Sequence, residues 1–486
     1  MKFSKQRILK LLKTKKSEYW TSKGQRMAAA LLKNVVATVP AYKKFFGKKT
    51  LSEAPIVNKK NYLRRFSYHE LFREGSLEQH LIYTATSGST SIPYYFARNE
   101  SLDWQYSLLI EQFLAQSSYG DHGSILVVVA FGMGIWIGGL ITYKAFEIAS
   151  MTRSVPVSII TPGINKKEIF NIFCNLAPHY GQVILVGYPP FIKDILDEGE
   201  VEGINFKTFN MRLLFAAESF SETFRTYVAK KAGIKNVYRD TLNIYGSADI
   251  GAMAYETPLS ILIRELTLKN RQMFEALFSH ISKIPTFAQY NPLFIHFETS
   301  HGELLLTGDN AIPLVRYAIG DHGGTYSFHQ IEKLLADHHL DLRQEANRAG
   351  ITTTIQELPF VYVYERNDFS TTIYGLQVYP GSVRDVLMEG VLEKKLTGKL
   401  VLETQYDDQQ NQYLGIHLEL KRNVISNTTL HVTAYQKIIT RLKEVNSEFR
   451  ELSIFLKDRV LIKIYFHPLG DPTYFPMGIK QRWVKK

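Results

Sequence analysis

A run of small hydroxyl residues around one glycine is the first stretch of the chain with clear chemical potential. Leu81–Thr84 is typical of a β-strand, and five small residues follow it, Thr86-Ser87-Gly88-Ser89-Thr90. Small side chains let backbone N–H groups approach an anion closely, and the hydroxyls add further donors. The run is therefore suited to holding the phosphates of a nucleotide, although Ser/Thr/Gly clusters are also common in plain surface turns.

Composition bounds the class of protein. The 486 residues are 45% hydrophobic and 21% charged, which is ordinary globular composition, and the length indicates two to four domains. The single cysteine, Cys174, excludes an internal disulfide framework and a zinc site built from several cysteines. A reducing, cytoplasmic location is the expectation.

The net charge of +12 is concentrated at the two ends of the chain. Its main contributors are Lys2, Lys5, Arg7, Lys10, Lys13, Lys15 and Lys16, with Lys480, Arg482, Lys485 and Lys486. Such a fringe can favour RNA or anionic membrane surfaces, but it is also the ordinary composition of a solvated surface. No aromatic-interleaved RNA-binding motif accompanies it, so no nucleic-acid partner is expected.

Residues Ser124–Tyr143 carry no charge and are about as numerous as a bilayer span requires. Four glycines interrupt them, and the opening Ile125–Val129 is short and β-branched, as in a buried parallel strand. We predict a strand, a glycine-rich turn and a helix start here, and no membrane span. No apolar stretch follows the basic first residues, so no secretory signal is expected.

Buried-strand patterns alternate with helical patterns through the first 365 residues. The first 50 residues read as helix until Pro40, and residues 101–117 form a second amphipathic pattern. The predicted strands are Ile125–Val129, Val155–Ile160, Gln182–Val186, Met211–Phe215 and Val237–Ile244. This alternation indicates α/β layers.

After residue 365 the pattern of predicted helices and strands changes, which indicates a separate, smaller unit, residues 366–486. We predict a hairpin turning at Gly375, then helix, strand, strand, helix and strand. The elements after the hairpin are a helix at Ser382–Lys395, strands at Lys399–Thr404 and Tyr413–Glu419, a helix at Leu430–Phe449 and strands near Leu452–Lys463. The fold class is therefore α/β, with a large N-terminal lobe of layered sheets and helices and a smaller C-terminal α+β domain.

Four further stretches stand in a fixed order behind the hydroxyl-rich run. They are Ala216–Glu222, Asn243–Asp249, Val315–Asp321 and Glu365–Asp368 with Tyr374–Pro380 after it. Together these resemble the motifs of the adenylate-forming (ANL) superfamily, and they are most similar to its phenylacetate–CoA ligase and capsule-type branch. Weaker similarity is found at Ala54–Lys59 and at Ile479-Lys480.

The resemblance implies a two-step reaction that uses ATP and Mg²⁺. A carboxylate attacks the α-phosphorus of ATP to give acyl-AMP and pyrophosphate, and a thiol, amine or hydroxyl then takes the acyl group. Positioning and charge neutralisation would supply most of the rate. The residues it assigns to the nucleotide are Ser87, Gly88, Ser89 and Thr90 at the β,γ-phosphates, Ala217, Glu218 and Ser219 at the adenine edge, Tyr245, with Gly246 and Ser247, as the adenine stack, Asp321 at the ribose hydroxyls and Arg366 at the ribose or phosphate.

The resemblance also implies a metal ligand and two residues that act in domain movement. Asp249 stands where the family has a Mg²⁺-binding glutamate, and a surface carboxylate is the alternative. Asp368 corresponds to the hinge of the small domain. Lys480 would bridge the carboxylate and the α-phosphate during adenylation, with a merely basic tail, including Lys485, as the competing interpretation.

The phosphate run departs from the family pattern. Ser91 replaces a glycine, Ile92 replaces a lysine and Tyr94 replaces another frequent lysine. The loss of lysine removes a charge that would face phosphate. Either the charge comes from elsewhere or the enzyme is slow.

The acyl group is expected in the charge-free stretch, where aromatic and apolar walls suit an aryl or aliphatic acid. Its predicted lining is Phe131, Met133, Trp136 and Gly138, and core packing explains the same residues almost as well. The first acceptor hypothesis is CoA. An amine or hydroxyl in polysaccharide or natural-product biosynthesis is the alternative, as is a degenerate, non-catalytic homologue that only binds nucleotide. The sequence leaves the oligomeric state open, a homodimer being one possibility.

Overall fold

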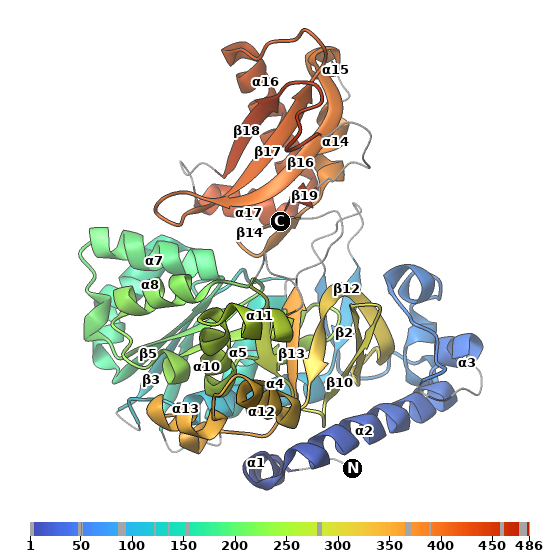
Figure 1. The fold of residues 1–486 in the computed structure, drawn as a ribbon, viewed down its shortest axis with the longest axis vertical. Helices are drawn as coiled ribbons and strands as arrows, with labels where there is room; N and C mark the ends of the chain where they lie inside the picture. The colour runs from blue at the N-terminus through green and yellow to red at the C-terminus, as the bar shows by residue number, and fades with distance from the viewer. Residues whose placement is uncertain are drawn as a thin grey trace.

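The computed structural model describes residues 4–46, 50, 52–85, 94–120, 123–134, 137–151, 153, 155–278, 284–364, 371–387, 390–456, 461–475 and 484–485. Figure 1 shows a large lobe built around a central sheet and a smaller lobe stacked at one end of it, with β14 and α17 at the junction. The mixed α/β class and the two-lobed arrangement confirm the predicted fold class.

The large lobe is organised by an 11-stranded sheet with the order β10-β11-β12-β13-β9-β8-β7-β6-β5-β3-β4. One half is parallel: β3 (Ile125–Ala130), β4 (Val157–Ile160), β5 (Gln182–Gly187), β6 (Met211–Ala216) and β7 (Thr241–Ser247). The rest is antiparallel: β8 (Gly251–Tyr255), β9 (Thr286–Gln289), β10 (Ile295–Ser300), β11 (Glu303–Gly308), β12 (Leu314–Tyr326) and β13 (Phe360–Tyr364). The strands β3 and β5 are buried at every position, as their unbroken apolar runs predict.

Helices follow most of the parallel strands and cover the sheet (Figure 1). They are α5 (Ile137–Ser150), α6 (Lys166–Asn175), α7 (Pro189–Val201) and α8 (Glu222–Ala232). The other helices of this lobe are α1 (Lys5–Thr14), α2 (Ser17–Thr38), α3 (Pro40–Phe46), α4 (Glu100–Ala115), α9 (Val237–Asp240), α10 (Pro258–Leu268), α11 (Arg271–Phe278), α12 (Phe328–Asp337) and α13 (Leu342–Arg348). A separate hairpin is formed by β1 (Ile82–Ala85) and β2 (Tyr95–Arg98).

Short helical turns complete the lobe. The first, η1 (Lys59–Leu63), is a π-helical turn, and the 3₁₀ turns are η2 (His69–Leu71), η3 (Arg73–Gly75), η4 (Ala177–His179), η5 (Phe206–Thr208) and η6 (Thr352–Thr354).

The uncharged stretch 124–143 forms β3 and the first turns of α5, as predicted. Within the part of the chain that the structure describes, no helix has both the length and the apolar character needed to cross a bilayer.

One predicted strand begins too early. Val237–Asp240 is the short helix α9, and β7 starts only at Thr241. The side chain of Asn236 accepts a hydrogen bond from Arg239 N at 3.1 Å, and this cap starts the helical turn despite the β-branched Val237. Apolar content alone misplaced the boundary.

The small lobe has a four-stranded sheet with the order β18-β17-β16-β19. Its elements are the hairpin β14 (Thr371–Ile373) and β15 (Leu376–Val378), α14 (Pro380–Leu387), α15 (Gly390–Lys395), β16 (Leu396–Tyr406), β17 (Gln412–Leu420), α16 (Thr428–Val445), α17 (Ser447–Phe455), β18 (Ile462–His467) and β19 (Val484–Lys485). The hairpin turns at Tyr374-Gly375, as predicted.

The predicted helix Leu430–Phe449 is two helices, and the strand expected from Leu452 begins only at Ile462. Asn446 explains both differences. Its backbone ends α16 in an extended conformation, and its side chain accepts a hydrogen bond from Phe449 N at 2.9 Å to cap α17. The new helix then runs through Phe455 and delays the strand.

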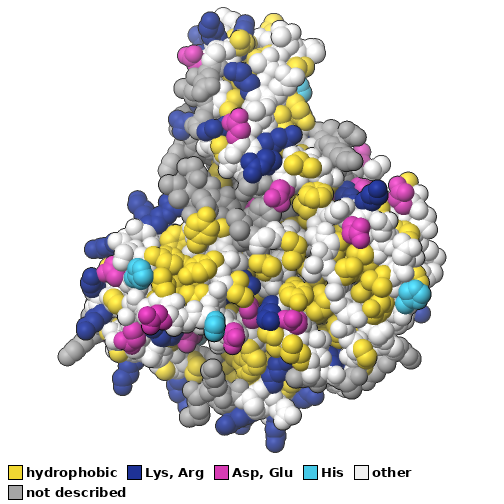
Figure 2. Space-filling view, turned by 180° about the vertical axis from the view of Figure 1, so that it is seen from behind, with side chains coloured by type: hydrophobic (Ala, Val, Ile, Leu, Met, Phe, Trp, Pro, Cys, Tyr) yellow, Lys and Arg dark blue, Asp and Glu magenta, His cyan; other side chains and the backbone are white. Residues whose placement is uncertain are grey.

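The two lobes share apolar packing. One continuous cluster of buried side chains extends from β5 and α7 of the large lobe into β16, β17 and β18 of the small lobe. Figure 2 shows apolar side chains gathered in patches on one face of the large lobe, whereas Lys and Arg are spread over both lobes on that face.

Candidate functional site

The ends of neighbouring parallel strands converge on one cavity of about 350 Å³. Phe131 follows β3, Tyr188 follows β5, Ala217–Ser219 follow β6, and Ser247–Asp249 end β7 and begin its turn. Because carboxyl ends of parallel strands meet at one sheet edge, segments far apart in sequence are brought together. The sheet changes from parallel to antiparallel at β7 and β8, and the cavity lies at this change.

Asp321 and Tyr245 meet at the cavity wall. The Tyr245 hydroxyl donates a hydrogen bond to Asp321 Oδ2 at 2.5 Å, although 76 positions separate the two residues. Asp321 lies on the long strand β12 and is 8% exposed, and both residues line the cavity. A carboxylate with two acceptor oxygens therefore borders a ligand-sized space beside an aromatic ring.

Asp249 is held by a cation and a hydroxyl. Its Oδ1 lies 3.2 Å from Lys59 Nζ, and its Oδ2 accepts a hydrogen bond from Tyr317 at 2.5 Å. Asp249 is 2% exposed and lines the cavity together with Lys59. Among the described residues, no group of three or more His, Cys, Asp or Glu side chains could hold a metal. Both oxygens of Asp249 are engaged by protein groups, and its role as a metal ligand stays a prediction.

The segment that carries Lys59 is fixed to β12. Val57 N donates to Arg316 O at 3.1 Å, and Ala318 N donates to Val57 O at 2.8 Å, a parallel bridge of one residue. Asn58 then caps η1, at whose first position Lys59 stands. Lys59 is thereby held beside the turn that follows β7.

A second cation and two flanking residues complete this polar end. Arg64, just after η1, lines the cavity. Ala85 and Tyr94, the described residues on either side of segment 86–93, also line it. The described flanks of the hydroxyl-rich run therefore lie at the same end of the cavity as Lys59 and Arg64.

The turn after β6 is conformationally unusual. Ala217 has φ 78°, a left-handed conformation that is uncommon for a residue other than glycine. Its neighbour Glu218 is 6% exposed, and Glu218 O accepts a hydrogen bond from Asn243 Nδ2 at 3.0 Å. This bond ties the turn to β7 and keeps both motifs against the cavity. Ala217, Glu218 and Ser219 all line it.

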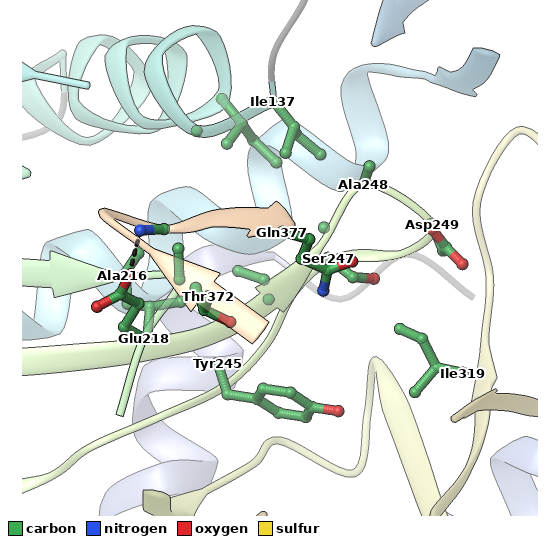
Figure 3. Close-up of a pocket in the computed structure, with 18 of the residues that line it drawn as sticks. Ile137, Ala216, Glu218, Tyr245, Ser247, Ala248, Asp249, Ile319, Thr372 and Gln377 are labelled. Atoms are coloured by element: carbon green, nitrogen blue, oxygen red, sulfur yellow. Dashed lines mark hydrogen bonds between the residues drawn. The ribbon is translucent and has the colours of Figure 1, made fainter. Parts of the chain in front are cut away.

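The side chain of Glu218 faces the small lobe. Its Oε1 accepts a hydrogen bond from Gly375 N, and its Oε2 accepts one from Gln412 Nε2 at 3.1 Å. The neighbouring Tyr374 donates its hydroxyl to Asp194 Oδ2 at 3.0 Å. Figure 3 shows Glu218 and the hairpin residues Thr372 and Gln377 around the same space. The hairpin β14–β15 thus closes one side of the cavity.

Replacement of Gly375 by alanine is expected to loosen the contact between the lobes. Gly375 has φ 78°, and a Cβ there would lie 2.6 Å from Tyr188 Cδ1. Left-handed backbone costs an alanine about 1 kcal/mol, and the ring contact adds to it. We expect a larger radius of gyration in small-angle X-ray scattering. Gly350→Ala is the matched control, because Gly350 has φ 67° but no atom near its Cβ position; equal effects of the two variants would contradict the contact.

Another part of the cavity wall is largely apolar. The rings of Phe131 and Tyr188 meet edge to face at 4.9 Å, and Ile137, Gly138 and Ile141 of α5 line the wall. Two polar groups stand there as well, since Tyr106 and Thr142 form a hydroxyl pair at 3.2 Å.

Met133, expected near the acyl group, is not among the described residues that line this cavity. A Cβ on Gly139 would lie 2.5 Å from Met133 Sδ, so the methionine packs against the start of α5 instead. Gly139 leaves the room that this packing needs.

Several predicted site residues lie outside the described residues. These are Ser87, Gly88, Ser89, Thr90, Trp136, Arg366, Asp368 and Lys480. The cavity brings together the remaining ones, which are Phe131, Gly138, Ala217, Glu218, Ser219, Tyr245, Gly246, Ser247, Asp249 and Asp321.

Sequence reasoning did not assign several other lining residues to the site: Lys59, Arg64, Tyr106, Thr142, Tyr188, Thr372 and Glu448. Lys59 stands in a stretch that resembles a family motif, and Tyr188 lies two positions after the predicted strand Gln182–Val186, so there was reason in the sequence to consider both. Glu448 carried none.

The fold was compared with known proteins. No protein-family model matches the sequence, and no curated protein matches it. Among solved structures, 2-hydroxyisobutyryl-CoA ligase with 2-HIB-AMP and CoA in the thioesterification state is similar, with a TM-score of 0.62, 14% identity, and coverage of 98% of this chain and 91% of that one. The chain shares the two-domain α/β fold of this ligase.

The same ligase in other states is less similar. Its open conformation gives a TM-score of 0.51 at 13% identity, covering 97% of this chain and 92% of that one. Its postadenylation state with 2-HIB-AMP gives 0.50 at 13% identity, covering 98% and 90%.

Proposed function

We propose that this protein is an adenylate-forming ligase, which activates a carboxylic acid with ATP and then transfers the acyl group. The observation that carries the proposal is one cavity lined by the carboxylate of Asp321 and the ring of Tyr245, by the cations Lys59 and Arg64, and by the apolar Phe131. An acyl adenylate offers a partner to each of these groups: ribose and adenine, a phosphate, and an organic acyl chain. The shared fold with an acyl-CoA ligase supports the proposal.

The nucleoside would lie against Asp321 and Tyr245. Asp321 would accept hydrogen bonds from the ribose hydroxyls. The hydrogen bond from the Tyr245 hydroxyl to Asp321 would weaken as the Tyr245 ring packs on adenine. The turn Ala217–Ser219 would present backbone groups to the edge of the base. Arg366 at the ribose or phosphate is carried by the resemblance alone.

The phosphates would lie beside Lys59 and Arg64. Lys59 and Arg64 would supply the positive charge that is lost where Ile92 and Tyr94 replace lysines. Ser87–Thr90 would add N–H and hydroxyl donors. ATP would arrive as its Mg²⁺ complex, which is substrate. Contact of that ion with Asp249 stays a prediction, and it would require Lys59 to move away from Oδ1.

The chemistry follows from position. A carboxylate oxygen of the acid attacks the α-phosphorus, and pyrophosphate leaves with the bonding pair. The apolar wall of Phe131, Gly138 and Ile141 would hold the organic part of the acid, which favours an aryl or aliphatic chain. Lys480 would approach the reacting oxygens as the small domain turns about Asp368, a role that rests on the resemblance.

For the second step we favour CoA as the acceptor, in a cytoplasmic reaction. The ligase of the same fold was solved with CoA bound, and the lobe arrangement here overlays better on its thioesterification state than on its open state. An amine or a hydroxyl acceptor is the second candidate.

Acid-dependent ATP–pyrophosphate exchange tests the proposal. The purified full-length chain is incubated with labelled pyrophosphate, ATP and a panel of aryl and aliphatic acids. We expect exchange that depends on at least one acid. Binding of ATP without any acid-dependent exchange would favour the non-catalytic nucleotide-binding alternative.

A further inference from the structure

Glu448 of the small lobe lines the cavity of the large lobe. It is the second residue of α17, whose cap Asn446 also donates from Nδ2 to Gln377 O at 3.1 Å. That bond joins the start of the helix to the hairpin strand β15, which is docked on Glu218 through Gly375. The position of Glu448 is thus set by the contact that closes the cavity.

The carboxylate of Glu448 is partly buried and makes no hydrogen bond or ion pair with any residue that the structure describes. Glu218 differs, because both of its oxygens accept hydrogen bonds. A carboxylate that faces a cavity without a protein partner is free to accept a proton from a bound molecule.

The groups facing Glu448 come from four places. Glu451 lies one turn along α17, Glu218 and Tyr188 belong to the large lobe, and Tyr379 follows β15. Burial raises the pKa of Glu448 to about 7, and the charge of Glu451 adds to the rise. Burial also raises the pKa of the Tyr188 hydroxyl, with contributions from Glu448 and Glu218, so Tyr188 remains neutral.

We infer that Glu448 is the general base that takes the proton of the acceptor nucleophile in acyl transfer, an inference that rests on the proposed function. The acceptor sulfur attacks the carbonyl carbon of the acyl adenylate and forms the C–S bond. The bond between that carbon and the phosphate oxygen breaks, and AMP leaves with the electron pair. The S–H proton passes to Glu448.

The closed arrangement of the lobes supports this timing. The side of the cavity built by the small lobe consists of Thr372, Gly375, Gln377, Tyr379 and Glu448. The arrangement overlays better on the thioesterification state of the ligase with the same fold than on its postadenylation state. Glu448 therefore reaches the site in the arrangement that belongs to transfer.

The rate of acyl transfer should depend on pH through the ionisation of Glu448. Glu448 must be ionised to accept a proton, so the rate of transfer should rise through pH 7 and level off above it. A thiol without a base reacts through its own thiolate, whose pKa is about 8.5. Loss of Glu448 should therefore move the midpoint of the profile upward to the pKa of the acceptor thiol.

The experiment supplies phenylacetyl-AMP or hexanoyl-AMP and CoA to the full-length chain and follows loss of free thiol in single turnovers. Glu448→Gln should lower the rate about 15-fold at pH 7, since about half of Glu448 is ionised there in the wild type, against about 3% of a thiol of pKa 8.5 in the variant. At pH 9.5 the variant should come within about twofold of the wild type, because the thiolate then predominates. A structural defect would not disappear with pH.

Two further variants test the role of Glu448 if Glu448→Gln folds poorly. Glu448→Asp keeps the carboxylate and should keep the midpoint near pH 7 at a lower rate. Glu451→Gln removes the neighbouring charge and should shift the midpoint below that of the wild type. An unchanged profile in Glu448→Gln would overturn the inference while exchange still supports the proposed function. Absence of wild-type transfer from both adenylates to CoA would overturn it as well, and absence of exchange would overturn both.

Discussion

Replacement of Asp321 by asparagine is expected to lower the rate of acid-dependent ATP–pyrophosphate exchange by roughly 100- to 1,000-fold. The aspartate offers two acceptor oxygens to the two ribose hydroxyls, whereas asparagine offers one acceptor and turns an N–H donor toward the other hydroxyl. The nucleotide would bind more weakly and with its α-phosphorus displaced. The measurement is exchange at saturating acid over a range of ATP concentrations.

The control for this change is Asp337→Asn, which makes the same substitution at an exposed site at the end of α12. It should leave exchange unchanged. Asp321 already accepts a hydrogen bond from Tyr245, and the amide oxygen introduced by Asp321→Asn could still accept it, so thermal unfolding should change little. If Asp321→Asn kept more than a third of the wild-type rate, the placement of the ribose at Asp321 would be contradicted.

The parts of the fold that were predicted correctly are those decided by local pattern. The unbroken apolar run at Ile125–Val129 fits a strand that is buried on both faces, and the glycines after it end the run before α5 begins. Gly375 correctly marks the turn of the small hairpin, because glycine readily adopts the positive φ that the structure shows there. The order of the motifs along the chain predicts that Tyr245 and Asp321 lie in one site, and the two side chains are in contact.

The parts that sequence reasoning missed depend on contacts between distant elements. Asn446 divides α16 from α17. Its capping role depends on the extended backbone that it adopts between the two helices, which the sequence does not reveal. Asp249 is predicted to bind a metal ion, and sequence reasoning did not foresee that Lys59, almost 200 positions away, contacts one of its oxygens. The backbone of Glu218 is predicted at the adenine edge, and sequence reasoning did not foresee that its side chain binds the hairpin of the other lobe. No local pattern encodes such partners.

Replacement of Lys59 by glutamine is the second change with a large expected effect, a loss of roughly 100- to 1,000-fold in exchange. Lys59 is 30% exposed at its side chain, lies 3.2 Å from Asp249 and borders the cavity beside the flanks of the hydroxyl-rich run. Under the proposed function it would neutralise charge on the phosphates, a role that the resemblance gives to a lysine at position 92. Lys60→Gln, at the adjacent exposed residue, is the control and should leave exchange unchanged.

A purely structural role of Lys59, as the partner of the buried Asp249, makes a different prediction. Under that role, Lys59→Gln would lose activity only through lower stability, and a lysine introduced elsewhere could not restore it. If Lys59 supplies a positive charge to the phosphates, Ile92→Lys in the Lys59→Gln background should raise the exchange rate at least tenfold. That change restores a lysine at the position where the resemblance has one. Recovery without a rise in the unfolding temperature would assign Lys59 to the phosphates. No recovery, together with a lowered unfolding temperature that Asp249→Asn restores, would make it a structural partner alone.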